Sequence, residues 1–201
     1  MKVALIPCGP TEWQQEGRLL GRVEVALSPD GEQQCGRWVE QLAGLGLGRI
    51  CHAPDELATR TALFVGRRLG IPAKAVAALA EVDIGLWAGL TEEQLRRRYA
   101  RAHRELCEAP LHVLPPSGES LHDAAARLRA CIARQLRRNG EAGIGVVTRP
   151  LSLAMIGCML AGGAFANLWE SARELEEPVV FEYDPRSGPR TLLSEDAAGK
   201  S

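Results

Sequence analysis

Hydrophobic residues along the chain follow two alternating patterns. Continuous apolar runs of four or five residues, as in 3–7 and 144–147, predict buried strands that are covered on both faces. Between such runs, apolar residues recur every three or four positions, which predicts amphipathic helices. The predicted strands are 3–7, 49–52, 75–79, 144–147, 178–183 and 190–193, and the predicted helices are 31–45, 55–69, 91–107, 121–138 and 150–160.

Strands that alternate with helices favour the α/β class, with a mostly parallel sheet in a three-layer α/β/α arrangement. A chain of 201 residues has the length of one ordinary domain. We expect a single domain over residues 1–195, in which 85–120 form a lid-like insertion. Residues 196–201 are predicted to be a disordered tail.

The charge balance and the cysteines narrow the class of protein. The chain has 24 basic and 25 acidic residues, so it shows no nucleic-acid footprint. It has no apolar run near 18 residues, and its first apolar run is too short for a signal peptide. Its six cysteines form no CxxC pair, which favours reduced thiols. We therefore expect a cytoplasmic protein without a membrane partner.

The carboxyl ends of parallel strands are where α/β folds place their ligand sites. Cys8 and Gly9 follow the first predicted strand, His52 ends the second, and Arg149 follows the strand at 144–147. Because these ends meet at one edge of a sheet, the four residues are expected near a common pocket.

Several short motifs occur in a recognisable order. They are Pro-Cys-Gly-Pro-Thr (7–11), Gly-Arg-Leu-Leu-Gly (17–21), Leu-Ser-Pro-Asp-Gly (27–31), His-Ala-Pro-Asp-Glu-Leu-Ala (52–58), Leu-Ala-Glu (79–81) running on to Gly-Leu-Thr (89–91), Ser-Gly-Glu-Ser (117–120) and Val-Thr-Arg-Pro (147–150). In order and spacing they resemble the histidine phosphatase superfamily, also called phosphoglycerate mutase-like, over almost the whole chain. The resemblance implies a phosphoglycerate mutase-like fold.

The resemblance also implies where the chemistry of the family would lie. In that family a histidine attacks phosphorus, two arginines and a second histidine hold the phosphoryl oxygens, and an acid protonates the leaving oxygen. Carried over by position, the nucleophile is Cys8 and the second histidine is Arg149, while the two arginines are Pro7 and Leu57. Asp55 stands where the family motif has leucine. The acid is retained as Glu81, which is either this acid or a structural acceptor for loop amides, and both readings stay open. The candidate catalytic residues are therefore Cys8, Glu81 and Arg149.

Further residues are candidates for binding a ligand at this site. Arg18 is a retained basic residue expected on the pocket rim. His52 and His122 are substitute bases or ordinary loop histidines, and both readings stay open. The full set of candidate ligand-binding residues is Gly9, Arg18, His52, Leu57, Ser120 and His122.

The departures from the family pattern fall on the chemistry. Phosphoryl transfer depends on cations that neutralise the phosphoryl oxygens, and loss of one preorganised donor typically costs about 10²–10³ in rate. We therefore expect a degenerate active site and a pseudophosphatase that acts as a binding or regulatory module. The alternative is a phosphomonoesterase or other hydrolase with a rebuilt site of Cys8, Arg149 and Glu81. A weaker alternative is a thiol-dependent activity at Cys8.

No cofactor or metal is predicted. Cys8, His52 and Glu81 could chemically bind zinc, but no ligand spacing supports such a site. The expected partner is an unidentified small molecule or protein, and a homodimer is possible. The basic segment 96–104 is either a solvated surface or a site for an acidic partner.

Overall fold

A computed structural model describes residues 1–26, 28–162, 165, 168–184, 186 and 188–191. The predicted tail at 196–201 and the end of the predicted strand at 190–193 lie outside these residues. The described chain contains a six-stranded sheet in the order β3-β2-β4-β1-β5-β6. Its strands are β1 (Lys2–Pro7), β2 (Leu47–His52), β3 (Ala73–Ala75), β4 (Gly143–Thr148), β5 (Val179–Asp184) and β6 (Gly188–Thr191).

The sheet is mostly parallel, as the sequence predicts. β1, β2, β3 and β4 run in one direction, while β5 is antiparallel to β1 and β6 is antiparallel to β5. The central strands β1 and β4 are buried along nearly their whole length. Their carboxyl ends lie next to each other at one edge of the sheet, where Pro7 pairs with Thr148.

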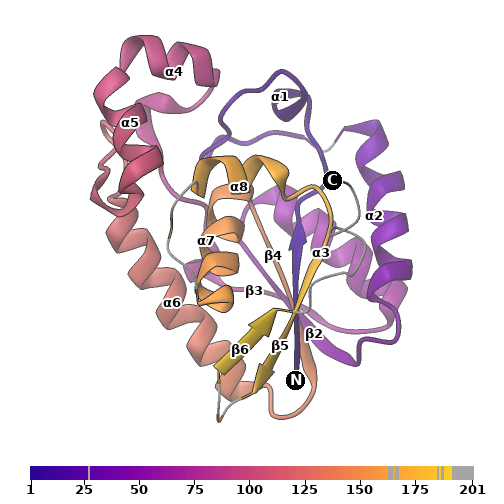
Figure 1. The fold of residues 1–201 in the computed structure, drawn as a ribbon. Helices are drawn as coiled ribbons and strands as arrows, with labels where there is room; N and C mark the ends of the chain where they lie inside the picture. Colours follow the sequence, from indigo (N-terminus) through magenta and orange to yellow (C-terminus); the bar gives the residue numbers. More distant parts are fainter. Residues whose placement is uncertain (27, 163–164, 166–167, 185, 187, 192–201) are drawn as a thin grey trace, which may run out of the picture.

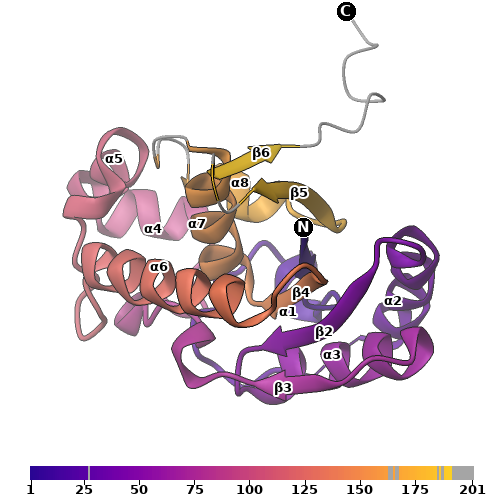
Figure 2. The same ribbon diagram turned by 90° about the horizontal axis from the view of Figure 1, so that it is seen from below.

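Helices cover both faces of the sheet. Figure 2 shows α2 and α3 on one side of the strands and α6 and α7 on the other. The helices are α1 (Glu12–Gln15), α2 (Pro29–Leu42), α3 (Glu56–Leu69), α4 (Glu92–Arg98), α5 (Ala100–Glu108), α6 (Leu121–Arg138), α7 (Pro150–Ala161) and α8 (Leu168–Glu174), with short 3₁₀ helices at Ala77–Leu79, Gly85–Trp87 and Pro110–His112. The three-layer α/β/α architecture is the one predicted. Within the described residues, no helix is long and apolar enough to cross a membrane.

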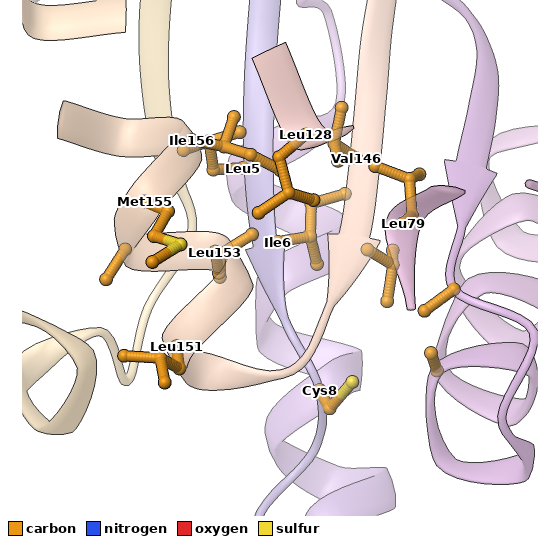
Figure 3. Close-up of a cluster of buried hydrophobic side chains, with 14 of the residues drawn as sticks. Leu5, Ile6, Cys8, Leu79, Leu128, Val146, Leu151, Leu153, Met155 and Ile156 are labelled. Atoms are coloured by element: carbon orange, nitrogen blue, oxygen red, sulfur yellow. The ribbon is translucent and has the colours of Figure 1, made fainter. Parts of the chain in front are cut away.

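The core lies on both faces of the central strands, against α2 and α3 on one face and α6 and α7 on the other. Leu5 and Ile6 of β1 pack with Val146 of β4, and Leu153 of α7 lies on the same cluster (Figure 3). Cys8 lies just beyond the end of β1, at the edge of this cluster. The core thus holds rigidly the two strand ends that carry the candidate site.

Two local predictions are wrong. The strand predicted at 75–79 is instead β3 at Ala73–Ala75, and the alanines that follow form a 3₁₀ turn. The single helix predicted at 91–107 is two helices, because Tyr99 leaves the helical conformation at φ −132° and ψ 48°. The Tyr99 ring packs against Trp87, with ring centroids 5.9 Å apart. Helix α8 was not predicted at all.

The segment 85–120 forms a separate group of helices beside α6 and α8, near the top of Figure 1. Within this segment, Gly85 adopts φ +51° and packs against the backbone of residues 116–118. A Cβ atom at Gly85 would lie 2.1 Å from the carbonyl oxygen of Pro116, so no larger residue fits there. Whether this segment acts as a lid stays a prediction.

Candidate active site

A cavity of about 480 Å³ opens at the carboxyl edge of the sheet, beside the ends of β1 and β4. Its wall combines the loop after β1, the segment 14–21, one face of α2, the start of α7 and helix α8. Most of the side chains that line it are apolar, including Leu19, Leu20, Trp38, Ile84, Leu151 and Trp169. Of the described residues in the wall, none belongs to 85–120.

Cys8 lines this cavity, as predicted from its place after β1. Its side chain is buried, with only 5% exposed. Burial raises the pKa of the Cys8 thiol well above its ordinary value of 9.0, and the Asp55 and Glu81 carboxylates add to that rise against the opposing charge of Arg149. A thiol, unlike a thiolate, is a poor nucleophile, so Cys8 is a poor nucleophile at neutral pH.

Arg149 is entirely buried, although its position is one that should present a cation to a phosphoryl group. Its Nε donates to Oδ1 of Asp55 at 3.0 Å. Its Nη1 donates to the carbonyl oxygens of Gly21 at 3.0 Å and Val23 at 2.5 Å. The guanidinium is therefore neutralised and held inside the protein, and it is not among the residues that line the cavity.

Asp55 is one of the residues at this site that the sequence did not predict. It ends the loop after β2 and accepts a hydrogen bond from the Ala58 amide at 3.1 Å, which caps α3. The same Oδ1 atom holds Arg149 from 94 positions away. A helix cap is visible in the sequence, but an ion pair over that separation is not. The nearest signal is that Asp55 stands where the family motif has leucine.

Glu81 is buried and lines the cavity, yet its carboxylate already has four donors. It accepts from the amides of Val82, Leu151 and Ser152 at 2.7, 3.0 and 2.8 Å, and from the Ser152 hydroxyl at 2.7 Å. Leu151 and Ser152 lie in the first turn of α7, where the helix dipole also stabilises a carboxylate. Burial raises the pKa of Glu81, and these hydrogen bonds oppose that rise. The structure thus gives Glu81 the role of an acceptor that anchors α7.

The cations at the rim of the cavity are paired as well. Arg18 lines the cavity, as predicted, but its Nε donates to Glu16 at 2.6 Å and its Nη1 to the Gly89 carbonyl at 3.0 Å. Arg173 of α8 pairs with Glu92. A ligand therefore meets cations whose charge is already balanced by carboxylates.

The remaining candidate ligand-binding residues do not line the cavity. The amide of Gly9 donates to the Thr61 hydroxyl at 3.2 Å, so it is already used. Leu57 is 1% exposed and belongs to the apolar core. His52 is also buried, and its Nδ1 lies 2.8 Å from the Ala53 carbonyl oxygen.

The two candidates around the 117–120 loop point elsewhere. Ser120 caps α6 by accepting from the Asp123 amide at 3.3 Å. Of the two readings of His122, the structure supports the ordinary exposed histidine, since its side chain is 72% exposed and lies beside Asp123. Within the described residues, Cys8, His52 and Glu81 do not form a metal-ligand cluster.

Two tryptophans in the wall were not predicted as site residues. Trp38 has the helical spacing of a core residue of α2, so its second role as a lining residue could not be predicted from the pattern. Trp169 lies in α8, the helix that the sequence analysis missed. Their rings make this cavity a place for an apolar or aromatic group.

The comparisons with known proteins agree with this fold. The sequence matches the family model of the histidine phosphatase superfamily (branch 1) over residues 3–195, and the chain belongs to that superfamily. A phosphoserine phosphatase 1 of Hydrogenobacter thermophilus is 24% identical over 169 residues, which cover 84% of this chain and 80% of that protein. A probable phosphoglycerate mutase GpmB of Citrobacter koseri is 26% identical over 176 residues, which cover 86% of this chain and 79% of its own.

Solved structures show the same fold. YhfR of Bacillus stearothermophilus superposes with a TM-score of 0.81 at 22% sequence identity, and 96% of each chain is covered. At this level of identity the likeness establishes the fold.

Proposed function

We propose that this protein is a pseudophosphatase, a histidine-phosphatase-fold module that binds an uncharged small molecule in its cavity and does not turn over phosphate esters. The observation that supports it most directly is the buried ion pair of Arg149 with Asp55. The cation that a phosphoryl group would need is held by a carboxylate and two carbonyl oxygens.

The other groups at the site support the same proposal. A phosphate dianion in the cavity would meet the protonated thiol of Cys8 and the carboxylate of Glu81, with no uncompensated cation among the lining residues described. Transfer of a charged group from water into such an environment is costly unless it is paired. An aromatic or aliphatic group has no such transfer cost, and it gains apolar contact with Trp38 and Trp169.

The test compares 1-naphthol with 1-naphthyl phosphate, two ligands that differ only in the phosphate. We expect no hydrolysis of 1-naphthyl phosphate at neutral pH above that in protein-free buffer. By calorimetry, we expect 1-naphthol to bind at least about tenfold more tightly than 1-naphthyl phosphate. The replacement Ala172→Phe should fill the cavity and weaken 1-naphthol binding, whereas Ala126→Phe on the exposed face of α6 should not.

Two results would overturn the proposal. Hydrolysis that is lost in Cys8→Ser but kept in Cys107→Ser, a change at an exposed thiol, would indicate the alternative, a phosphomonoesterase with a rebuilt site. Preferential binding of 1-naphthyl phosphate without hydrolysis would indicate a sensor of phosphorylated ligands.

A further inference from the structure

A second pocket, separate from the cavity at Cys8, lies where the outer strands of the sheet meet α6. It has a volume of about 330 Å³ and is lined by Arg49, Lys74, Ala75, Val76, Arg134, Gln135 and Arg138. It shares no lining residue with the first cavity. Four of its seven lining side chains are cationic, and none is acidic.

Three elements bring these cations together. Arg49 is on β2, Lys74 is on the edge strand β3, and Arg134 and Arg138 are one turn apart on α6. Figure 2 shows β3 at the outer edge of the sheet and α6 on the face beside it. No sequence motif links residues 49, 74 and 134, so the cluster exists only in the folded chain.

These cations are not neutralised by the protein. In the part of the chain that the structure describes, no ion pair joins any of the four to a carboxylate. The chain as a whole has a formal net charge of −1, so the cluster does not reflect a generally basic protein. Like charges held close together repel one another, and a bound anion would relieve that repulsion.

The deepest cation of the pocket is held in position. Arg49 Nη2 donates to the backbone oxygen and to the side-chain Oε1 of Gln135, at 3.2 and 3.3 Å. Gln135 is 8% exposed, and its Oε1 also accepts from the Cys51 thiol at 3.5 Å. The Nε of Arg49 is buried without a hydrogen-bond partner. The hydrogen bonds to Gln135 hold the Arg49 side chain in one orientation at the pocket wall.

We infer that this pocket is a binding site for a compact anion with several phosphate groups. Arginine guanidinium groups match phosphate oxygens with two parallel hydrogen bonds, and three of the four cations are arginines. The fixed Arg49 supplies an oriented donor, and the exposed side chains of Lys74, Arg134 and Arg138 can close around the ligand. The site is independent of the cavity at Cys8 and of the proposed loss of phosphatase activity.

The test is calorimetry of the full chain with tripolyphosphate at low salt, with orthophosphate and citrate as comparison anions. We expect saturable binding of tripolyphosphate, tighter than that of either comparison anion and weakened as sodium chloride is raised. The double variant Arg134→Gln/Arg138→Gln should bind at least about tenfold more weakly, since two charge-assisted contacts are lost. Amide shifts in NMR spectra should concentrate at residues 74–76 and 134–138.

The matched control is Arg97→Gln/Arg98→Gln on α4, which removes the same charge from another exposed arginine pair. Its affinity should stay within about twofold of the parent protein. Thermal melts of both variants verify that the fold is kept. An equal loss of tripolyphosphate affinity in both variants would mean that any exposed positive charge attracts the anion, and this would overturn the proposed site. The absence of saturable binding, or equal binding of citrate, would overturn it as well.

Discussion

The guanidinium group of Arg149 donates a 3.0 Å hydrogen bond to Asp55, and the arginine side chain is fully buried. The two residues lie at the ends of neighbouring strands, Asp55 after β2 and Arg149 after β4. In the family pattern these two positions carry leucine and histidine. The cation that should meet an external anion is thus paired with a carboxylate of the same chain.

The first prediction concerns the stability that this pair supplies. Asp55→Asn keeps the cap of α3 but removes the charge opposite Arg149, so the free energy of unfolding should fall by about 2 kcal/mol. Urea denaturation measures this, and a cycle with Arg149→Met should give a coupling of about 1–3 kcal/mol. Asp123→Asn, at an exposed carboxylate, serves as the control and should change stability by less than about 0.5 kcal/mol. Zero coupling would mean that the pair does not hold the site together.

The sequence predicted the fold better than the contents of the site. Buried strands such as β1 and β4 have continuous apolar runs, and α6 has both a cap at Ser120 and a clear helical period. These local signals suffice for the architecture. The break at Tyr99 depends on packing against Trp87, and the displaced β3 lies in an alanine-rich stretch with weak preference, so neither could be predicted locally.

The candidate site was predicted only in its positions. Cys8 and Glu81 line the cavity. Their positions could be predicted because each belongs to a short motif at the end of a strand or in a loop. Arg149 was expected at the pocket, and its burial depends on contacts with Asp55, Gly21 and Val23 that are distant in sequence. Such contacts have no periodic signature, so the neutralisation of the site became visible only in the folded chain.

The second prediction concerns the reactivity of Cys8. Because its pKa is raised well above 9.0 and its side chain is buried, Cys8 should react slowly with iodoacetamide at pH 8 in the native protein. The exposed Cys107 should be alkylated first. Mass spectrometry of tryptic peptides over time distinguishes the two thiols. Comparable rates in the native state would mean that Cys8 is a thiolate and would favour a thiol-dependent activity.

The third prediction concerns the pH dependence that Glu81 adds. Its pKa is raised above the ordinary 4.5 in the folded chain, so the folded state binds its proton more tightly than the unfolded state does. Stability from this group is therefore fully present below pH 4.5 and decreases as the pH rises through the raised folded pKa. Glu81→Gln removes this titration. The difference in unfolding free energy between parent and variant, measured by urea denaturation, should thus decline with rising pH over that interval and then level off.

At neutral pH the same variant should still be less stable than the parent. The glutamine amide group would face amide and hydroxyl donors at the start of α7, where the carboxylate accepts from all four. A loss of about 1–3 kcal/mol is expected for a buried donor left unpaired. A variant as stable as the parent at pH 7 would show that Glu81 does not anchor α7.

The last prediction concerns the restoration of a phosphate site. Pro7→Arg, Cys8→His, Leu57→Arg and Arg149→His together give this chain the four cationic side chains that the family pattern implies. In that quadruple variant Asp55 keeps its carboxylate but loses Arg149, its partner in the parent. The carboxylate would then repel phosphate or pair with one of the new cations. The quadruple variant alone should therefore bind orthophosphate weakly.

Addition of Asp55→Leu, the residue of the family motif, removes this carboxylate. We expect this fivefold-substituted variant to bind orthophosphate at least about tenfold more tightly than the quadruple variant, because a carboxylate that repels phosphate has been removed. Calorimetry gives both affinities, and circular dichroism verifies that both variants fold, since Asp55→Leu also removes the cap of α3. A control with Asp123→Leu in place of Asp55→Leu should give no gain. If the quadruple variant already binds as tightly as the fivefold one, Asp55 is not what excludes phosphate, and the substituted cations alone explain the loss.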